Sequence, residues 1–256
     1  MNFGLSNKVA IVTGGSHGIG RAITLTLANE GCRVAIIART ERDILAELKT
    51  MKGLFIPLDV ETCDNTAILL AVKNIKNHFG SIDILVNNVG GGGRWGKEQP
   101  ELTPIKTWYE VYKKNALTAV QFTMACIPYM KEQKRGRVVT VSSIYGREGG
   151  GRPWFNMAKS AEISLMKTLA MNREYARSNI TFNSVAPAGI MIPDTGWEKM
   201  QKENPQEYAK WCENLPMGRL GKPEEVANVV TFLCSQGASF VSGSCVAIDG
   251  GEGKSF

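Results

Sequence analysis

The chain has 256 residues, of which 43% are hydrophobic and 21% are charged, and its formal net charge is +6. This length and composition are ordinary for one globular α/β domain and exclude a disordered or fibrous protein. Basic residues are spread along the chain and mixed with acidic ones, so we expect no nucleic-acid partner. Because no run approaches the roughly 20 apolar residues of a membrane span and the N-terminal segment lacks secretory features, we expect a cytoplasmic protein with no membrane partner.

Short runs rich in Val and Ile alternate along the chain with longer segments of helical periodicity. The runs that predict strands are 9–12, 34–38, 54–58, 82–86, 138–141, 180–185 and 246–248. The segments that predict helices are 19–29, 44–50, 66–78, 117–130, 155–176 and 224–234. This alternation predicts an α/β fold: a single doubly wound, Rossmann-like domain over 1–256, with helices on both faces of a parallel sheet of about seven strands.

The segment 186–222 has neither a predicted strand nor a predicted helix, yet it carries Trp197, Tyr208 and Trp211. It is too aromatic for a spacer, so we interpret its central part, about 188–217, as a lid over a substrate. The cysteines are far apart without a CxxC pair, and His17 and His78 are widely separated. We therefore expect neither a metal site nor a disulfide framework.

A glycine-rich turn follows the first predicted strand and opens the first predicted helix. Glycines in such a turn let backbone N–H groups and the helix N-terminus approach a pyrophosphate without obstruction by a Cβ atom. We therefore predict a dinucleotide at this turn; its candidate contacts are Gly14, Ser16, His17, Gly18, Ile19 and Gly20.

The second predicted strand ends at Ala38, where an NAD-selective protein usually carries an acidic residue for the ribose 2′-hydroxyl. Arg39 and Thr40 follow instead. A guanidinium suits a 2′-phosphate, and His17 is a possible second donor. The sequence therefore favours NADP over NAD, with a solvated loop cation as the alternative reading of Arg39.

Several motifs in order make the chain resemble the short-chain dehydrogenase/reductase family. These are the TGGSHGIG turn, Asp59-Val60, Asn87-Asn88-Val89-Gly90, Asn115, the Ser142–Gly146 segment, RLGKPEE at 219–225 and the terminal IDGG. The resemblance implies a nicotinamide coenzyme contacted by Asp59, Val60, Asn87, Val89, Gly90 and the backbone of Ile190. It also implies a homodimer or homotetramer.

The resemblance further implies hydride transfer between the nicotinamide and a carbonyl or secondary-alcohol carbon. In that chemistry a serine hydroxyl holds the substrate oxygen, a tyrosine exchanges its proton, a lysine binds the coenzyme ribose and an asparagine holds a water relay. Ser143 is the favoured serine and Ser142 the alternative, while Asn115 and Lys159 occupy the other two positions.

Phe155 stands where the resemblance places the tyrosine, four residues before Lys159. A phenyl ring has no proton to give, so coenzyme binding is expected to survive this departure better than catalysis. Tyr145, a bound water or Ser143 itself could replace the phenol. A second Tyr-XXX-Lys, at Tyr109 to Lys113, precedes Asn115 in an expected helix, and we interpret it as a coincidence.

The chain departs from the family pattern again after the sixth predicted strand. Ile192 offers no side-chain hydrogen bond where the family has a threonine, although Thr195 could supply a hydroxyl after a small shift. The loops expected at this end also carry Arg94, Lys97, Arg147 and Arg152, with Trp95 and Trp154 beside them. Arginine binds carboxylate or phosphate with planar paired donors, so an anionic small-molecule substrate is one interpretation, and solvated or intersubunit cations are the other.

The resulting hypothesis is an NADP-dependent oxidoreductase acting on a carbonyl or secondary alcohol, with efficiency in doubt because of Phe155. The alternative is a sensor or scaffold that binds NADP(H) without turnover.

Overall fold

The computed structural model describes residues 3–41, 44–51 and 53–256, and its centre is a seven-stranded sheet in the order β3-β2-β1-β4-β5-β6-β7. All neighbouring strands pair in parallel. The strands are β1 (Val9–Thr13), β2 (Arg33–Ala38), β3 (Leu54–Pro57), β4 (Ile84–Asn87), β5 (Gly136–Val141), β6 (Ile180–Pro187) and β7 (Cys245–Ile248). The predicted fold class is confirmed, and each predicted strand begins and ends within two residues of the bounds of an observed strand.

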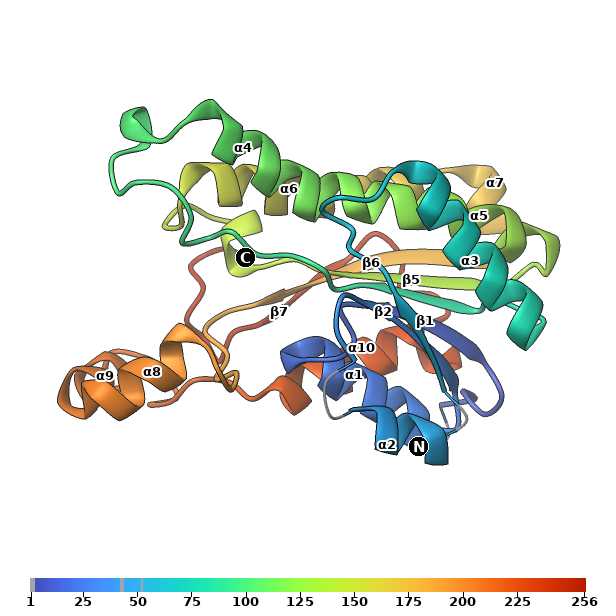
Figure 1. The fold of residues 1–256 in the computed structure, drawn as a ribbon, viewed down its shortest axis with the longest axis horizontal. Coiled ribbons are helices and arrows are strands. Elements are labelled where there is room, and N and C mark those ends of the chain that lie inside the picture. The colour runs from blue at the N-terminus through green and yellow to red at the C-terminus, as the bar shows by residue number, and fades with distance from the viewer. Residues whose placement is uncertain (1–2, 42–43, 52) are drawn as a thin grey trace.

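Helices cover both faces of the sheet, with α1, α2 and α10 on one side and α3, α5 and α6 on the other (Figure 1). The helices are α1 (Gly18–Asn29), α2 (Ile44–Thr50), α3 (Asn65–Phe79), α4 (Ile105–Tyr112), α5 (Thr118–Glu132), α6 (Pro153–Ala170), α7 (Arg173–Arg177), α8 (Gly196–Glu203), α9 (Pro205–Glu213) and α10 (Pro223–Cys234). Shorter turns are η1 (Pro100–Leu102), η2 (Lys113–Leu117), η3 (Ile144–Gly146) and η4 (Gln236–Ala238).

The strands show why the sequence requires two helical layers. Val9 and Ile11 of β1 belong to the core on the α3 and α5 side, whereas Ala10 and Val12 belong to the core on the α1 and α10 side. Successive strand residues point to opposite faces, and here both faces are apolar. A strand that is apolar throughout is buried only when helices pack on each side.

The chain builds the sheet outward from β1 through β2 to β3, then returns to place β4 on the other side of β1. Strand order thus reverses between β1 and β4. In open parallel sheets a ligand crevice forms beyond the carboxyl ends of the strands at such a reversal.

One helix prediction was wrong. The segment 155–176 forms α6 and α7, because the Asn172 side chain accepts hydrogen bonds from the N–H groups of Glu174 and Tyr175 and so begins a new helix. Before α5, the separate helix α4 leads into η2, a single π-helical segment. The segment predicted as a lid contains α8 and α9, which project beyond the sheet (Figure 1).

No helix among the described residues is long and apolar enough to cross a membrane.

Candidate active site

The glycine-rich turn between β1 and α1 is shaped by close backbone approaches. Gly14 has φ +64°, and a Cβ atom on Gly20 would lie 2.2 Å from the Gly14 carbonyl oxygen. Asn88, at the end of β4, braces the turn by donating its amide to the carbonyl oxygens of Thr13 and Gly14 at 3.0 and 3.3 Å. The turn therefore needs glycine for steric reasons, and it leaves the N-terminus of α1 open to an anion.

Beside this turn lies a cavity of about 270 Å³, referred to below as the nucleotide cavity. Nine residues predicted to contact the coenzyme line it: Gly14, Ser16, His17, Arg39, Thr40, Asp59, Val60, Val89 and Gly90. These residues come from segments that follow β1, β2, β3 and β4. The parallel sheet brings them together because all four strands end at the same edge.

Ionic contacts in the nucleotide cavity involve residues that the sequence analysis did not single out. Glu61 lies 3.3 Å from Arg39 and 2.9 Å from Lys114, measured between the Glu61 Oε1 atom and the nearest side-chain nitrogen. Arg39 is largely exposed, with 62% of its side-chain surface accessible. The cavity thus presents two cations that share one carboxylate.

Other residues predicted to bind coenzyme lie elsewhere. The Asn87 side chain is buried and donates to the hydroxyls of Thr123 and Thr140 at 3.0 and 3.2 Å, so it ties β4 to α5 and β5 instead of lining the nucleotide cavity. The Gly18 and Gly20 positions shape the turn: a Cβ atom on Gly18 would lie 2.9 Å from the Ile192 side chain. Ile192 therefore packs beside the first residue of α1 by apolar contact.

A second cavity, of about 370 Å³, adjoins the start of α1, and we call it the ring cavity. Ile19, Ile190, Ile192, Ser143 and Phe155 are among its lining residues. The Thr195 hydroxyl donates to the Ile192 carbonyl oxygen at 2.6 Å, which occupies its hydrogen atom. The mostly apolar wall suits one face of a flat heteroaromatic ring.

The two candidate serines after β5 have different surroundings. The Ser142 hydroxyl is buried and donates to the Lys159 carbonyl oxygen at 2.9 Å. The Ser143 hydroxyl accepts from the Tyr145 N–H at 3.2 Å, which leaves its own hydrogen available. Ser143 also lines both the ring cavity and the larger cavity described below. This geometry favours Ser143.

Asn115 lies at the centre of the π-helical segment η2 and is fully buried. Its amide donates to the carbonyl oxygens of Val111 and Gly91 at 2.7 and 2.9 Å, and its side-chain oxygen accepts from the Gly91 N–H at 3.1 Å. A Cβ atom on Gly90 would lie 2.7 Å from that oxygen and 2.9 Å from the Lys159 ammonium nitrogen. Gly90 therefore lets Asn115 and Lys159 approach the same point.

Phe155 and Lys159 lie one turn apart on α6, which begins with Pro153 in a favourable first-turn position. The Phe155 ring lines the ring cavity and packs near Gly93, while Lys159 is 4% exposed. The Lys159 ammonium donates to the Val141 carbonyl oxygen at 3.0 Å and to both carboxylate oxygens of Glu162 at 3.1 and 3.0 Å. Glu162 is a further member of this site that the sequence analysis missed.

The largest of these cavities, about 870 Å³, opens beyond Ser143 and Phe155, and we call it the substrate cavity. Trp197 of α8 and Trp211 of α9 form part of its wall with ring centroids 4.3 Å apart. Arg94 reaches across from the loop after β4, its guanidinium carbon 5.4 Å from the Trp197 ring centroid. The cavity also contains Arg152 and two carboxylates, Glu98 and Glu252.

The cluster of loop cations predicted from the sequence is only partly formed. Arg94 and Arg152 line the substrate cavity, while Lys97 and Arg147 lie outside it. The Arg147 guanidinium instead donates to the carbonyl oxygen of the C-terminal Phe256. Trp154 was predicted beside these cations but is fully buried against Trp108, at 5.4 Å between ring centroids.

Tyr145 lines the substrate cavity close to Ser143 in sequence, and its ring packs near Gly150 and Gly151. Burial, followed by the charges of Glu252 and Glu148, raises the pKa of its phenol. The hydroxyl therefore stays protonated at neutral pH. The other Tyr-XXX-Lys pair lies apart, since Tyr109 on α4 is 71% exposed and Lys113 donates to the Glu61 carbonyl oxygen.

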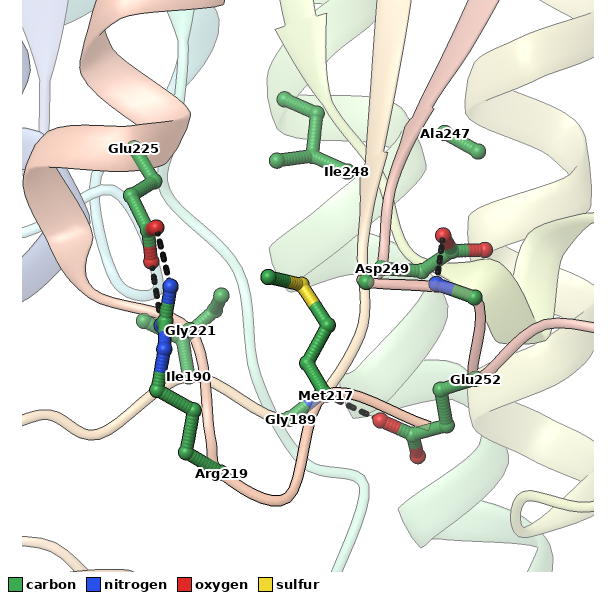
Figure 2. Close-up of a pocket in the computed structure, with 12 residues that line it drawn as sticks. Gly189, Ile190, Met217, Arg219, Gly221, Glu225, Ala247, Ile248, Asp249 and Glu252 are labelled. Atoms are coloured by element: carbon green, nitrogen blue, oxygen red, sulfur yellow. Dashed lines mark hydrogen bonds and ion pairs between the residues drawn. The ribbon is translucent and has the colours of Figure 1, made fainter. Parts of the chain in front are cut away.

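Another cavity, of about 370 Å³, is lined by residues between positions 189 and 225 and by residues 247–252, and its polar groups bond to one another (Figure 2). Arg219 pairs with Glu225 at 2.7 Å, and Asp249 accepts from the Gly251 N–H at 3.0 Å. Glu252 accepts from the Gly189 N–H at 3.2 Å, and both residues also line the substrate cavity. The C-terminal segment thus forms part of a wall shared by this cavity and the substrate cavity.

A parallel sheet with a glycine turn at its reversal point, a nucleotide cavity, and a serine and a lysine at its inner end defines a dinucleotide-dependent oxidoreductase. A family model described as enoyl-(acyl carrier protein) reductase matches residues 14–252. The chain belongs to the short-chain dehydrogenase/reductase family and is an NAD(P)-dependent carbonyl or alcohol oxidoreductase.

Individual relatives match along nearly their whole length. The chain is 36% identical over 253 residues to a 3-oxoacyl-(acyl-carrier-protein) reductase of Thermotoga maritima, covering 96% of this chain and 98% of the relative. It is 32% identical to the bovine (Bos taurus) dehydrogenase/reductase SDR family member 4, covering 97% and 88%. Among solved structures, Thermoplasma acidophilum aldohexose dehydrogenase shares 31% identity with a TM-score of 0.85, covering 97% and 95%. The Cj0485 dehydrogenase shares 30% with a TM-score of 0.89, covering 98% and 96%.

The sequence did contain one signal for Glu162. Positions 154, 158, 162 and 166 are spaced by four residues, and all four are buried on α6. Trp154, Ala158 and Met166 are apolar, so a glutamate at the remaining position contradicts the pattern of that helix face. Glu61 and Lys114, by contrast, have no comparable sequence signal, because they meet only when the loop after β3 approaches η2.

Proposed function

We propose that this protein is an NADP(H)-dependent reductase or dehydrogenase whose catalytic tyrosine position is occupied by Phe155. The observation that carries this proposal is that Ser143 and Phe155 line both the ring cavity and the substrate cavity. A substrate oxygen bound at their junction would lie beside a coenzyme ring. The lid role of 188–217 belongs to the same proposal, supported by Trp197 and Trp211 in the substrate-cavity wall.

Two features of the site fit a dinucleotide: the space left by glycines and the polar side chains that line the nucleotide cavity. Gly14, Gly20 and Gly90 leave the close approaches that a Cβ atom would block. Ser16, His17, Arg39 and Asp59 would hold the adenosine half, and Lys159 the nicotinamide ribose. Ile19, Ile190 and Ile192 would cover the ring. The preference for NADP is supported by Arg39 in the nucleotide cavity.

When bound, the coenzyme supplies or accepts a hydride at the substrate carbon. The Ser143 hydroxyl donates a hydrogen bond to the substrate oxygen and stabilises the negative charge that develops there. Phe155 contributes contact without a proton, so the proton comes from Tyr145, a bound water or Ser143. Loss of a general acid slows such a step about 10²- to 10⁴-fold, or roughly 3 to 5 kcal/mol in barrier, which leaves turnover measurable.

We propose an anionic substrate, supported by Arg94 and Arg152 in the substrate cavity. The T. maritima relative, a 3-oxoacyl-(acyl-carrier-protein) reductase, suggests an acyl group on an acidic carrier as one form of such an anion. Arginine pairs with carboxylate or phosphate through two parallel hydrogen bonds, so either anion would suit these side chains.

The experiment is a reduction assay in which purified protein, NADPH and a panel of neutral and anionic aldehydes and ketones are mixed and nicotinamide absorbance is followed. Substrate-dependent NADPH consumption, faster than with NADH, is the expected result. Saturable NADPH binding without turnover across the panel would favour the second candidate, a sensor or scaffold, for which Phe155 and Ile192 are the supporting observations. Failure to bind either coenzyme would reject both.

We also propose a homodimer or homotetramer acting in the cytoplasm. Exposed apolar side chains on α4, at the end of η2 and in the middle of α5, namely Ile105, Leu117 and Met124, support self-association. Analytical ultracentrifugation would measure the mass, and a monomer at micromolar concentration would contradict the oligomer proposal.

A further inference from the structure

Glu162 is a carboxyl group in an apolar setting beneath the coenzyme-binding edge. Glu162 is only 1% exposed, and it lies on a buried face of α6 together with Trp154, Ala158 and Met166. An ionised carboxylate in such a place is costly unless it is paired and hydrogen-bonded. Its presence therefore needs a partner, and the contacts identify that partner as Lys159.

The Lys159 ammonium is held by two acceptor groups of the protein, one carboxylate and one carbonyl. It lies 3.1 and 3.0 Å from the two Glu162 oxygens and 3.0 Å from the Val141 carbonyl oxygen. An ammonium has three donors: one shared between the two carboxylate oxygens and one directed at the end of β5 fix its direction and leave the third for the coenzyme ribose. The same nitrogen lies 2.9 Å from the point where a Cβ atom on Gly90 would stand, at the border of the nucleotide cavity.

The elements packed around this pair supply few other charges. From α6 itself the Phe155 ring lies 5.7 Å from the ammonium, measured to its centroid. Asn115 of η2 approaches from the Gly90 side, and the uncharged Ser142, after β5, lies close to Glu162. Among the described residues, Lys159 is the only ionisable group that interacts electrostatically with Glu162. Burial, the largest cause, raises the pKa of Glu162 to about 7, and Lys159 and Ser142 oppose that rise.

We propose that Glu162 is a positioning residue for coenzyme binding, whose carboxylate holds the Lys159 ammonium charged and fixed beside Gly90. The inference rests on the proposed function, since it assigns Lys159 to the coenzyme ribose. With a phenyl ring at position 155, the neighbour one turn earlier on α6 offers Lys159 no hydroxyl. Glu162 supplies the acceptor and counter-charge instead. Coenzyme affinity should therefore follow the ionisation of Glu162 and weaken as the carboxylate gains a proton.

The test is isothermal titration of the full chain with NADPH and with NADH over a pH series, comparing wild type with Glu162→Gln. We expect the wild-type affinity to fall on acidification through about pH 7. We expect Glu162→Gln to bind about tenfold more weakly at high pH, because it removes the coupling to Lys159, and to lose this pH dependence. Glu162→Asp, which keeps the charge, should restore part of the affinity and the dependence. Glu110→Gln, the same change at an exposed carboxylate on α4, is the control and should match wild type.

A double-variant cycle separates positioning from a general structural effect. In a Lys159→Met background, Glu162→Gln should cost no further coenzyme affinity, because its effect passes through the missing ammonium. An equal loss in both backgrounds, or an unchanged affinity and pH profile in Glu162→Gln, would overturn the proposal while leaving the proposed function intact. If Glu162→Gln does not fold, ¹³C NMR titration of the wild-type glutamate carboxyls decides: a Glu162 signal with an ordinary pKa contradicts the inference. Absence of coenzyme binding by wild type would instead reject the proposed function.

Discussion

The Lys159 ammonium lies 5.7 Å from the centroid of the Phe155 ring, one helical turn earlier on α6. A tyrosine at position 155 would carry its hydroxyl on this same ring, which also lines the ring and substrate cavities. Lys159 is thus close to the place where a phenol at position 155 would act, although Phe155 carries no hydroxyl.

Phe155→Tyr is therefore expected to increase the rate of carbonyl reduction. A correctly placed general acid contributes about 10² to 10⁴ in rate, so kcat/KM should rise by a factor in that range. Steady-state kinetics with the best substrate of the panel measures it. Phe155→Leu serves as the control, because it changes the ring without adding a proton donor. An equal rate in the tyrosine variant would mean that another group already performs the proton transfer.

Arg39 is expected to determine coenzyme choice. Arg39→Ala should weaken NADPH binding by about tenfold or more, since a guanidinium–phosphate contact is a strong, charge-assisted hydrogen bond, and should change NADH binding little. Glu61→Gln should instead strengthen NADPH binding, because the Glu61 carboxylate neutralises both Arg39 and Lys114. Fluorescence titration of wild type and of each variant with both coenzymes gives the dissociation constants. Arg173→Ala, an exposed site on α7, is the matched control.

The two arginines of the substrate cavity are expected to make the protein prefer anionic substrates over neutral ones. Arg94→Ala combined with Arg152→Ala should raise KM for an anionic substrate by about tenfold or more while affecting a neutral analogue much less. Lys97→Ala and Arg147→Ala, which remove cations outside the cavity, are the controls for net charge. Equal losses for anionic and neutral substrates would show that the arginines act on the cavity walls, for example through the Arg94 contact with Trp197.

Gly20 is expected to tolerate no side chain. In Gly20→Ala the new Cβ atom would lie 2.2 Å from the Gly14 carbonyl oxygen, so the turn must shift. We expect a loss of about 1 to 3 kcal/mol in the free energy of unfolding, as in other overpacked sites, together with loss of coenzyme binding. Urea denaturation and titration measure the two effects. Gly149→Ala has open space around the added atom and should change neither.

Stability should depend on pH through Glu162. Its ordinary pKa of 4.5 applies in the unfolded chain and burial raises it to about 7 in the folded chain, so the folded state holds more protons between these values. The contribution of this group to the free energy of unfolding is therefore largest at the acidic end and falls as pH rises from about 4.5 to about 7. Urea denaturation at several pH values measures this slope, and Glu162→Gln should flatten it. An identical slope in the variant would place the titrating group elsewhere.

Local patterns in the sequence were sufficient to predict the fold. Runs that are apolar at successive positions, such as Val9–Thr13, are typical of parallel strands covered on both faces, and their alternation with helical segments favours this arrangement. The glycine turn and Arg39 were equally readable, because a residue that directly follows a parallel strand lies at the ligand edge of the sheet. The helix break at Asn172 was not predicted, since helical periodicity continues across a residue that caps a new helix with its own side chain.

The sequence by itself determined the doubly wound sheet, the dinucleotide turn and the family, since these depend on residue types at fixed short spacings. Tertiary structure alone decided which polar side chains share an environment. It paired Glu61 with both Arg39 and Lys114, turned Asn87 inward and Ser143 outward, and left Lys97 and Arg147 outside the substrate cavity. It also buried Glu162 against Lys159. Burial and distance set the strength of a charge interaction, and neither can be obtained from positions along the chain.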